Sequence, residues 1–92
     1  MQRQNKKMIN TMSKEINHAD KGLIPAYPFS IKRSVVYGDY YIEKHRYRTN
    51  RNAIVEIWDV YLGTDLHSRI KSFSTLKAAK CFCYECWLEK QK

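Results

Sequence analysis

Residues 40–62 read YYIEKHRYRTNRNAIVEIWDVYL, a pattern typical of two strands joined by a short basic loop. Tyr40–Tyr47 is the first predicted strand and Ala53–Leu62 is the second, because both are rich in the β-branched and aromatic residues that fit a pleated sheet. Residues 48–52 form the loop between them. This stretch therefore predicts a β-hairpin.

The chain after this hairpin predicts one more strand and a helix. It turns at Gly63 and continues into a shorter predicted strand, Ser68–Phe73. Ser74 follows, and its side-chain oxygen can cap the free amides of a helix, Thr75–Glu89. The apolar face of that helix comprises Leu76, Ala79, Cys83 and Cys86.

The chain before the hairpin predicts a further strand, a connector and a helix. Ser30–Tyr37 is a strand that turns at Gly38 into the first strand of the hairpin. Residues 23–29 read LIPAYPF, and their two prolines indicate an extended connector without ladder pairing. Residues 4–20 carry apolar side chains at helical spacing, which predicts an amphipathic helix that ends at Gly22.

The predicted fold is a single α+β domain over residues 1–92. It has an N-terminal amphipathic helix within residues 1–22, a three- to four-stranded antiparallel sheet and a C-terminal helix packed on the sheet. Residues 30–90 form the sheet-plus-helix core, and residues 1–11 are a mobile tail if Met12 is the true start.

The strand over residues 53–62 is apolar on both faces, which indicates a cover on each. We expect the C-terminal helix on one face and the N-terminal segment or a partner on the other. Glu56 and Asp59 interrupt these faces, so neither face is expected to be wholly buried.

The charge of the chain favours a negatively charged partner. Lys and Arg number 17 against 9 Asp and Glu, which gives a formal net charge of +8. The excess lies in residues 1–22, 31–52 and 68–92, whereas residues 53–67 are net acidic. A positive field attracts polyanions, acidic proteins or anionic lipid, and the alternative is that it serves solubility alone.

The sequence does not predict a membrane protein or an exported one. It has no apolar run near the roughly 20 residues that a membrane span needs. The basic N-terminus is not followed by the apolar core of a signal peptide. We therefore expect a cytoplasmic protein.

Cys81, Cys83 and Cys86 form the most reactive-looking cluster. Their odd number does not indicate a disulfide framework. Three thiols and a histidine are a donor set for zinc, but these cysteines lie inside a predicted helix on the face that must contact the sheet. We interpret the cluster as core packing and predict no metal and no cofactor.

The sequence predicts no catalytic residues. The three histidines are scattered, and none lies beside a plausible nucleophile. Glu56 and Asp59 point to opposite faces of their strand and cannot act as a carboxylate pair. The three glycines form no phosphate-binding loop. The protein is therefore expected to act by binding and not as an enzyme.

The loop of the hairpin and its flanks carry the candidate binding chemistry, HRYRTNRN over residues 45–52. Guanidinium groups bind phosphate in a bidentate manner and stack on bases, and asparagine can read base edges. The predicted nucleic-acid or partner-binding residues are Lys32, Arg33, His45, Arg46, Arg48, Asn50, Arg51, Asn52, Arg69 and Lys71. The alternative is a solvated hairpin end.

The segment from Tyr40 to the C-terminus resembles the arm-type DNA-binding domains of phage integrases and the related AP2 domains. The likeness includes the junction FSTLKAA, residues 73–79, with an aromatic residue, a polar cap and a Thr-x-x-Ala helix start. The resemblance implies that the sheet enters the major groove. The contacts it implies are Arg46, Arg48, Arg51, Arg69 and Lys71. The acidic and bulky strand over residues 53–62 departs from such a surface.

In size, charge and layout the chain also resembles small phage-encoded anti-CRISPR proteins, particularly inhibitors of type I-F complexes. This resemblance implies a non-catalytic inhibitor that binds a host CRISPR-Cas ribonucleoprotein, contacts Cas subunits and guide RNA, and blocks target DNA. Mixed basic, acidic and aromatic patches favour such a nucleoprotein partner over bare duplex. The alternatives are a direct DNA-binding module of a phage or mobile element and an interaction protein that docks through its N-terminal helix.

Overall fold

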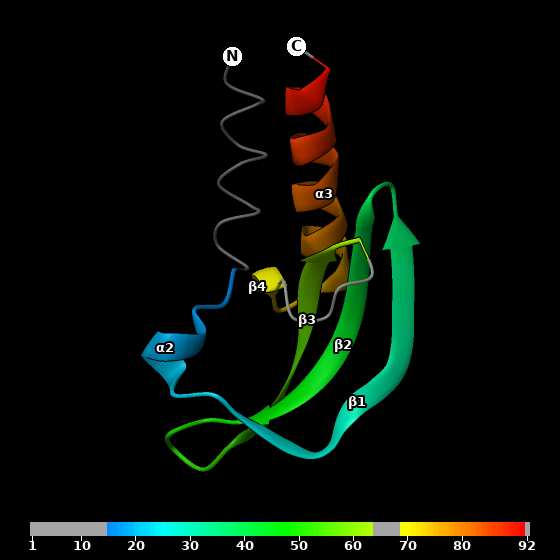
Figure 1. The fold of residues 1–92 in the computed structure, drawn as a ribbon. Coiled ribbons are helices and arrows are strands. Elements are labelled where there is room, and N and C mark those ends of the chain that lie inside the picture. Colours follow the sequence, from blue (N-terminus) through cyan, green and yellow to red (C-terminus); the bar gives the residue numbers. More distant parts are fainter. Residues whose placement is uncertain (1–14, 64–68, 92) are drawn as a thin grey trace.

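A computed structural model describes residues 15–63 and 69–91, which form an antiparallel sheet with a helix on one face (Figure 1). The sheet is four-stranded in the order β1-β2-β3-β4, so each strand pairs with its neighbour in sequence. The elements are α2 (His18–Lys21), β1 (Ile24–Tyr37), β2 (Tyr40–Arg48), β3 (Ile54–Leu62), β4 (Arg69–Phe73) and α3 (Leu76–Lys90). The predicted α+β class, with an antiparallel sheet and a C-terminal helix, is confirmed.

Strands β2 and β3 form an uninterrupted hairpin that runs from Tyr40 opposite Leu62 to Arg48 opposite Ile54. Successive side chains of a strand point to opposite faces, so the hairpin gives the sheet two different surfaces. The face that packs on α3, called here the helix-side face, is apolar where the helix covers it. Its core residues are Tyr40, Ile42, Trp58, Val60 and Phe73.

The other surface, called here the opposite face, is also partly covered. Ile57 and Tyr61 of β3 point to it and are buried. Strand β3 is therefore covered on both faces, as its two apolar patterns predict.

Helix α3 closes the helix-side face. Its N-cap is Thr75 and not the predicted Ser74, because the Thr75 hydroxyl accepts the N–H of Ala78 at 3.1 Å. Ala79 and Cys83 are buried in the core. Burial raises the pKa of Cys83 to about 12, so its thiol stays protonated and packs as a small apolar group.

Strand β1 is longer than predicted, because it includes most of residues 23–29; the connector prediction is therefore wrong. Pro25 lies opposite Tyr47, and pairing resumes at Ser30 after an irregularity. Proline is tolerated here because β1 is an edge strand, where one row of amides needs no partner. Gly38, with a φ of 63°, turns β1 into β2 as predicted.

The predicted helix over residues 4–20 lies mostly outside the described residues. In the part that is described, Glu15 is extended and bridges to Phe73, and the Ile16 N–H donates to the carbonyl of Ser72 at 2.7 Å. Glu15 and Ile16 therefore pair with the free edge of β4 and do not continue a helix. Of the helices described, none has both the length and the apolar composition to cross a membrane.

A short helix, α2, follows the bridge and is capped by Asn17, whose side chain accepts two backbone N–H groups. Gly22 ends α2 with a φ of 57°, in the left-handed region that favours glycine. A Cβ at Gly22 would lie only 3.0 Å from the Cβ of Asn50. Glycine therefore both ends α2 and lets the β2–β3 loop approach it.

Candidate functional site

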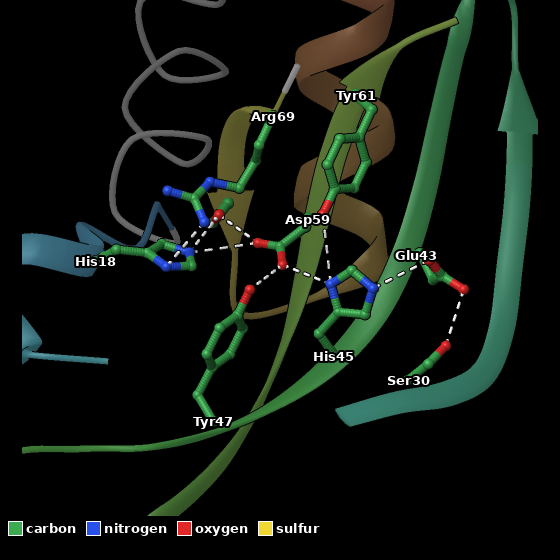
Figure 2. Close-up of polar contacts among 9 residues, drawn as sticks. His18, Ser30, Glu43, His45, Tyr47, Asp59, Tyr61 and Arg69 are labelled. Carbon is green, nitrogen blue, oxygen red and sulfur yellow. Dashed lines mark hydrogen bonds and ion pairs between the residues drawn. The ribbon is translucent and has the colours of Figure 1, made fainter. Parts of the chain in front are cut away.

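A buried carboxylate, Asp59, lies at the centre of the opposite face (Figure 2). One of its oxygens accepts hydrogen bonds from His45 Nδ1 at 2.7 Å and from the hydroxyl of Tyr47. The other accepts the hydroxyl of Ser72 and lies 3.3 Å from His18 Nε2. Asp59 therefore collects donors from β2, β4 and the N-terminal segment.

These contacts keep Asp59 ionised despite its burial. Desolvation by itself raises the pKa of a carboxyl group. The hydrogen bonds from His45, Ser72 and Tyr47 outweigh that effect and hold the pKa of Asp59 below its ordinary value of 3.8. A buried charge is tolerated when it is paired and hydrogen-bonded, and Asp59 meets both conditions.

His45 is the cation of this cluster. Its Nδ1 faces Asp59, and its Nε2 lies 3.0 Å from Oε1 of Glu43. Carboxylates only accept, so both ring nitrogens carry protons and the imidazole is charged. Burial lowers the pKa of His45, but the bonds to the two carboxylates raise it above 6.5. Phe29 of β1 stacks on the ring with centroids 4.1 Å apart and covers the cation.

His18 is held in the neutral form. Arg69 donates to its Nδ1 at 3.1 Å, so the proton is on Nε2, which lies 2.8 Å from the Ser72 hydroxyl oxygen. Burial and then the Arg69 charge lower the pKa of His18 below 6.5, although Asp59 opposes them. The ring also contacts Tyr47 edge-on, with centroids 4.8 Å apart. His18 thereby fixes α2 to the sheet.

This cluster is built to hold the fold together. All four ring nitrogens of His18 and His45 are engaged by other side chains. A general base needs a free lone pair aimed at a substrate, and neither imidazole offers one in this arrangement. Across the described residues, no group of three or more His, Cys, Asp or Glu side chains is arranged to hold a metal ion.

The pKa shifts of this cluster predict a stability maximum near neutral pH. A lowered His18 pKa means that stability falls as pH drops below 6.5 toward the folded pKa, because the unfolded chain then binds the proton more readily. A raised His45 pKa has the opposite sign: its stabilisation is complete below 6.5 and is lost as pH rises through the folded pKa.

Urea unfolding between pH 5 and 9 measures both contributions. We expect His18→Gln to reduce the loss of unfolding free energy at acid pH. We expect His45→Gln to reduce the loss of unfolding free energy at alkaline pH. Identical pH profiles for these two variants would contradict the assignment of the two protonation states.

The second feature is the turn end of the β2–β3 hairpin, called here the tip, residues 48–52, which begins at the last residue of β2. Thr49 organises it: its hydroxyl accepts the N–H groups of Arg51 and Ala53, each at 3.2 Å. The N–H of Asn50 donates to the carbonyl of Lys21 at 3.0 Å and docks the tip on α2. The tip is therefore braced from two sides.

The tip presents exposed cations. Arg48 and Arg51 are exposed, and so is Lys21 of the neighbouring α2. Arg48 donates to the Oδ1 of Asn52 at 2.9 Å, which orients its guanidinium along the loop. A hollow of about 410 Å³ lies where the tip meets α2. Its lining residues are Asp20, Lys21, Thr49, Asn50, Arg51 and Ala53.

The two β2 cations next to the tip share one carboxylate within the sheet. Lys44 and Arg46 lie on the helix-side face and both contact Glu56, at 3.2 Å and 2.8 Å. Lys44 also lies over the ring of Trp58, 5.5 Å from its centroid. This pairing lowers the positive field on the helix-side face of the hairpin.

The predicted binding residues do not form one surface. The tip holds Arg48, Asn50, Arg51 and Asn52 together, whereas Arg46 lies on the helix-side face. His45 is buried on the opposite face, and Arg69 reaches that face to contact His18. Lys71 is bound to Glu15 at 2.8 Å. Lys32 and Arg33 belong to β1, and their side chains lie outside the described part of the structure.

Sequence reasoning did not find the cluster around Asp59. The sequence contains a pattern that indicates part of it: Glu43, His45 and Tyr47 occupy alternate positions of β2 and therefore point to the same face. Pairing of Glu43 with Asp59 across the hairpin brings the carboxylate to the same face.

The family and fold of this chain were also compared with those of known proteins. No family model, no curated protein and no solved structure matches it.

Proposed function

We propose that the chain acts by binding nucleic acid and that the tip is its contact surface. The observation that carries this proposal is the braced loop on which Arg48 and Arg51 are exposed beside Lys21. Guanidinium groups are suited to phosphate because their paired donors match its oxygens. A net charge of +8 attracts a polyanion to the same surface over a longer range.

The bracing of the tip supports a binding role. A loop that is already fixed loses less conformational entropy on binding than a flexible one, so ordering its cations costs less free energy when a partner associates. Thr49 and the carbonyl of Lys21 fix the backbone on either side of Arg51. A loop that only kept the protein soluble does not need this order.

The layout of charge favours a single strand or a nucleoprotein over bare duplex. Duplex binding rewards a continuous basic face. Here Arg46 is paired with Glu56, and Lys71 with Glu15. On the opposite face, the central region that a groove-binding sheet would present is occupied by His18 and Phe29. The tip is thus a small contact at the end of the sheet.

The salt dependence of binding to short oligonucleotides tests the proposal. If three tip-region cations neutralise phosphates, the logarithm of the binding constant should fall with the logarithm of salt with a slope of about −2 to −3. Binding that does not weaken with salt, or no binding to any oligonucleotide, contradicts it.

The identity of the target stays a prediction. Inhibition of a CRISPR surveillance complex and direct DNA binding are distinguished by a pull-down from phage-host lysate with and without nuclease. Cas subunits that survive nuclease treatment support the inhibitor. DNA alone, lost on nuclease treatment, supports the DNA-binding module.

A further inference from the structure

An aromatic pocket lies at the other end of the sheet, between the β1–β2 turn and the C-terminal half of α3. In Figure 1 both segments are at the top, and the tip is at the bottom. The pocket has a volume of about 280 Å³. Ligand pockets for drug-sized molecules begin at about 300 Å³, so this one is suited to a single flat ring system.

The walls of this pocket are aromatic side chains that the core does not use. Trp87 is 48% exposed, Tyr84 is 38% exposed and Tyr37 is 36% exposed. Tyr84 and Trp87 stack with centroids 6.0 Å apart and planes 21° apart. Tyr40 and Cys83, which also line the pocket, belong to the core. The arrangement is a rigid floor with flat, accessible side walls.

Two ammonium groups flank the aromatic walls. The Nζ of Lys80 lies 5.9 Å from the ring centroid of Tyr37, and the Nζ of Lys90 lies 5.8 Å from that of Tyr40. Asp39 is the acid at the rim, and Lys90 contacts its Oδ2 at 3.5 Å. An aromatic slot with cations beside it is the combination by which proteins hold unpaired bases and their phosphates.

We propose that this pocket binds one unpaired nucleobase of a single strand, by stacking on Trp87 and Tyr84 with Lys80 and Lys90 beside the flanking phosphates. The inference rests on the proposed function, because the same strand contacts the tip. Strand β2 spans nine residues, or about 27 Å, between the two sites. A stacked strand that reaches both needs about eight nucleotides.

A protein partner fits this pocket less well. An apolar peptide would remove the ammonium groups of Lys80 and Lys90 from water against an apolar surface, and burying a charge in this way is costly. A nucleotide supplies both the flat ring and the negative charge.

The test compares a thymidine 12-mer with an abasic 12-mer, which keeps the phosphates and lacks the bases. We expect the wild-type protein to bind the thymidine strand about 5- to 100-fold more tightly. Trp87→Ala should remove this difference and leave affinity for the abasic strand unchanged. Leu88→Ala, at an exposed neighbour on α3 that does not line the pocket, should preserve the difference.

Each result separates the pocket from the tip. If the wild-type protein binds the two strands with equal affinity, the pocket does not bind a base, and the proposed binding at the tip still holds. No binding to either strand overturns the proposed function and this inference with it. If Trp87→Ala lacks the native circular dichroism spectrum, Trp87→Phe replaces it. That variant should retain a preference for bases, and loss of preference in a folded Phe variant contradicts stacking.

Discussion

Replacing Asp59 with asparagine is expected to lower the free energy of unfolding by about 3–5 kcal/mol, the usual cost of removing one partner of a buried ion pair. The substitution leaves the His45 cation with Glu43 alone and converts an acceptor into a group that must also donate. The Ser72 and Tyr47 hydroxyls then face an amide that cannot accept all their bonds. Urea unfolding at pH 7 measures the loss.

Glu56→Gln is the matched control, because it makes the same change on the same strand. Glu56 contacts Lys44 and Arg46 at the surface of the helix-side face, where solvent screens the charges. Its effect on stability should be much smaller than that of Asp59→Asn. Equal effects of the two substitutions would show that the cluster around Asp59 does not hold the sheet together.

A double variant separates the ion pair from the rest of the cluster. The variant that combines Asp59→Asn with His45→Gln removes both buried charges, so neither is left without its partner. The combined loss should therefore be smaller than the sum of the single losses, since residues in one network are coupled. Additive losses would mean that Asp59 and His45 stabilise the protein independently.

The elements that local pattern determines could be predicted from the sequence. The β2–β3 hairpin and α3 each carry a complete signal: alternation on two strands with a short loop, and apolar spacing after a polar cap. The predicted bounds of α3, Thr75–Glu89, each lie one residue before the observed ones, because the N-cap is Thr75 and not the adjacent Ser74, which carries an equivalent hydroxyl group.

The elements that depend on distant contacts could not be predicted. Proline in residues 23–29 indicates a connector unless one knows that β1 is at the edge of the sheet. Glu15 forms an antiparallel bridge with Phe73, which follows it by more than fifty residues. No local pattern in the sequence specifies that bridge. His18 reaches Asp59 across a sequence separation of 41, which composition and periodicity do not encode.

The candidate site was predicted in part for the same reason. Composition alone identifies the tip as basic, and the tip residues lie together because they are neighbours in sequence. Composition also assigned His45 to that surface, although strand alternation sends it to the opposite face with Asp59. Whether a cation can contact a ligand depends on the face of the sheet to which its side chain points and on its ion pairs. Both depend on the register of the strands.

Replacing Arg48 and Arg51 with alanine is expected to weaken oligonucleotide binding by about a hundredfold or more. Hydrogen bonds to charged groups contribute about 1.5–3 kcal/mol each, and two of them at the lower limit correspond to this factor. The fold should be retained, because both side chains are exposed and the loop is held by Thr49 and Lys21. Fluorescence anisotropy with a labelled thymidine 12-mer measures the affinity.

Two controls show whether position and geometry matter as well as charge. Lys77→Ala removes a positive charge from an exposed position on α3 and should change affinity far less than either tip arginine. Replacing both tip arginines with lysine keeps the charge but loses the planar fork, so it should restore part of the affinity if phosphates are held in a bidentate manner. Each phosphate contact removed should also reduce the salt slope by about one. A folded double-alanine variant with wild-type affinity and slope would place the nucleic-acid contact elsewhere on the protein.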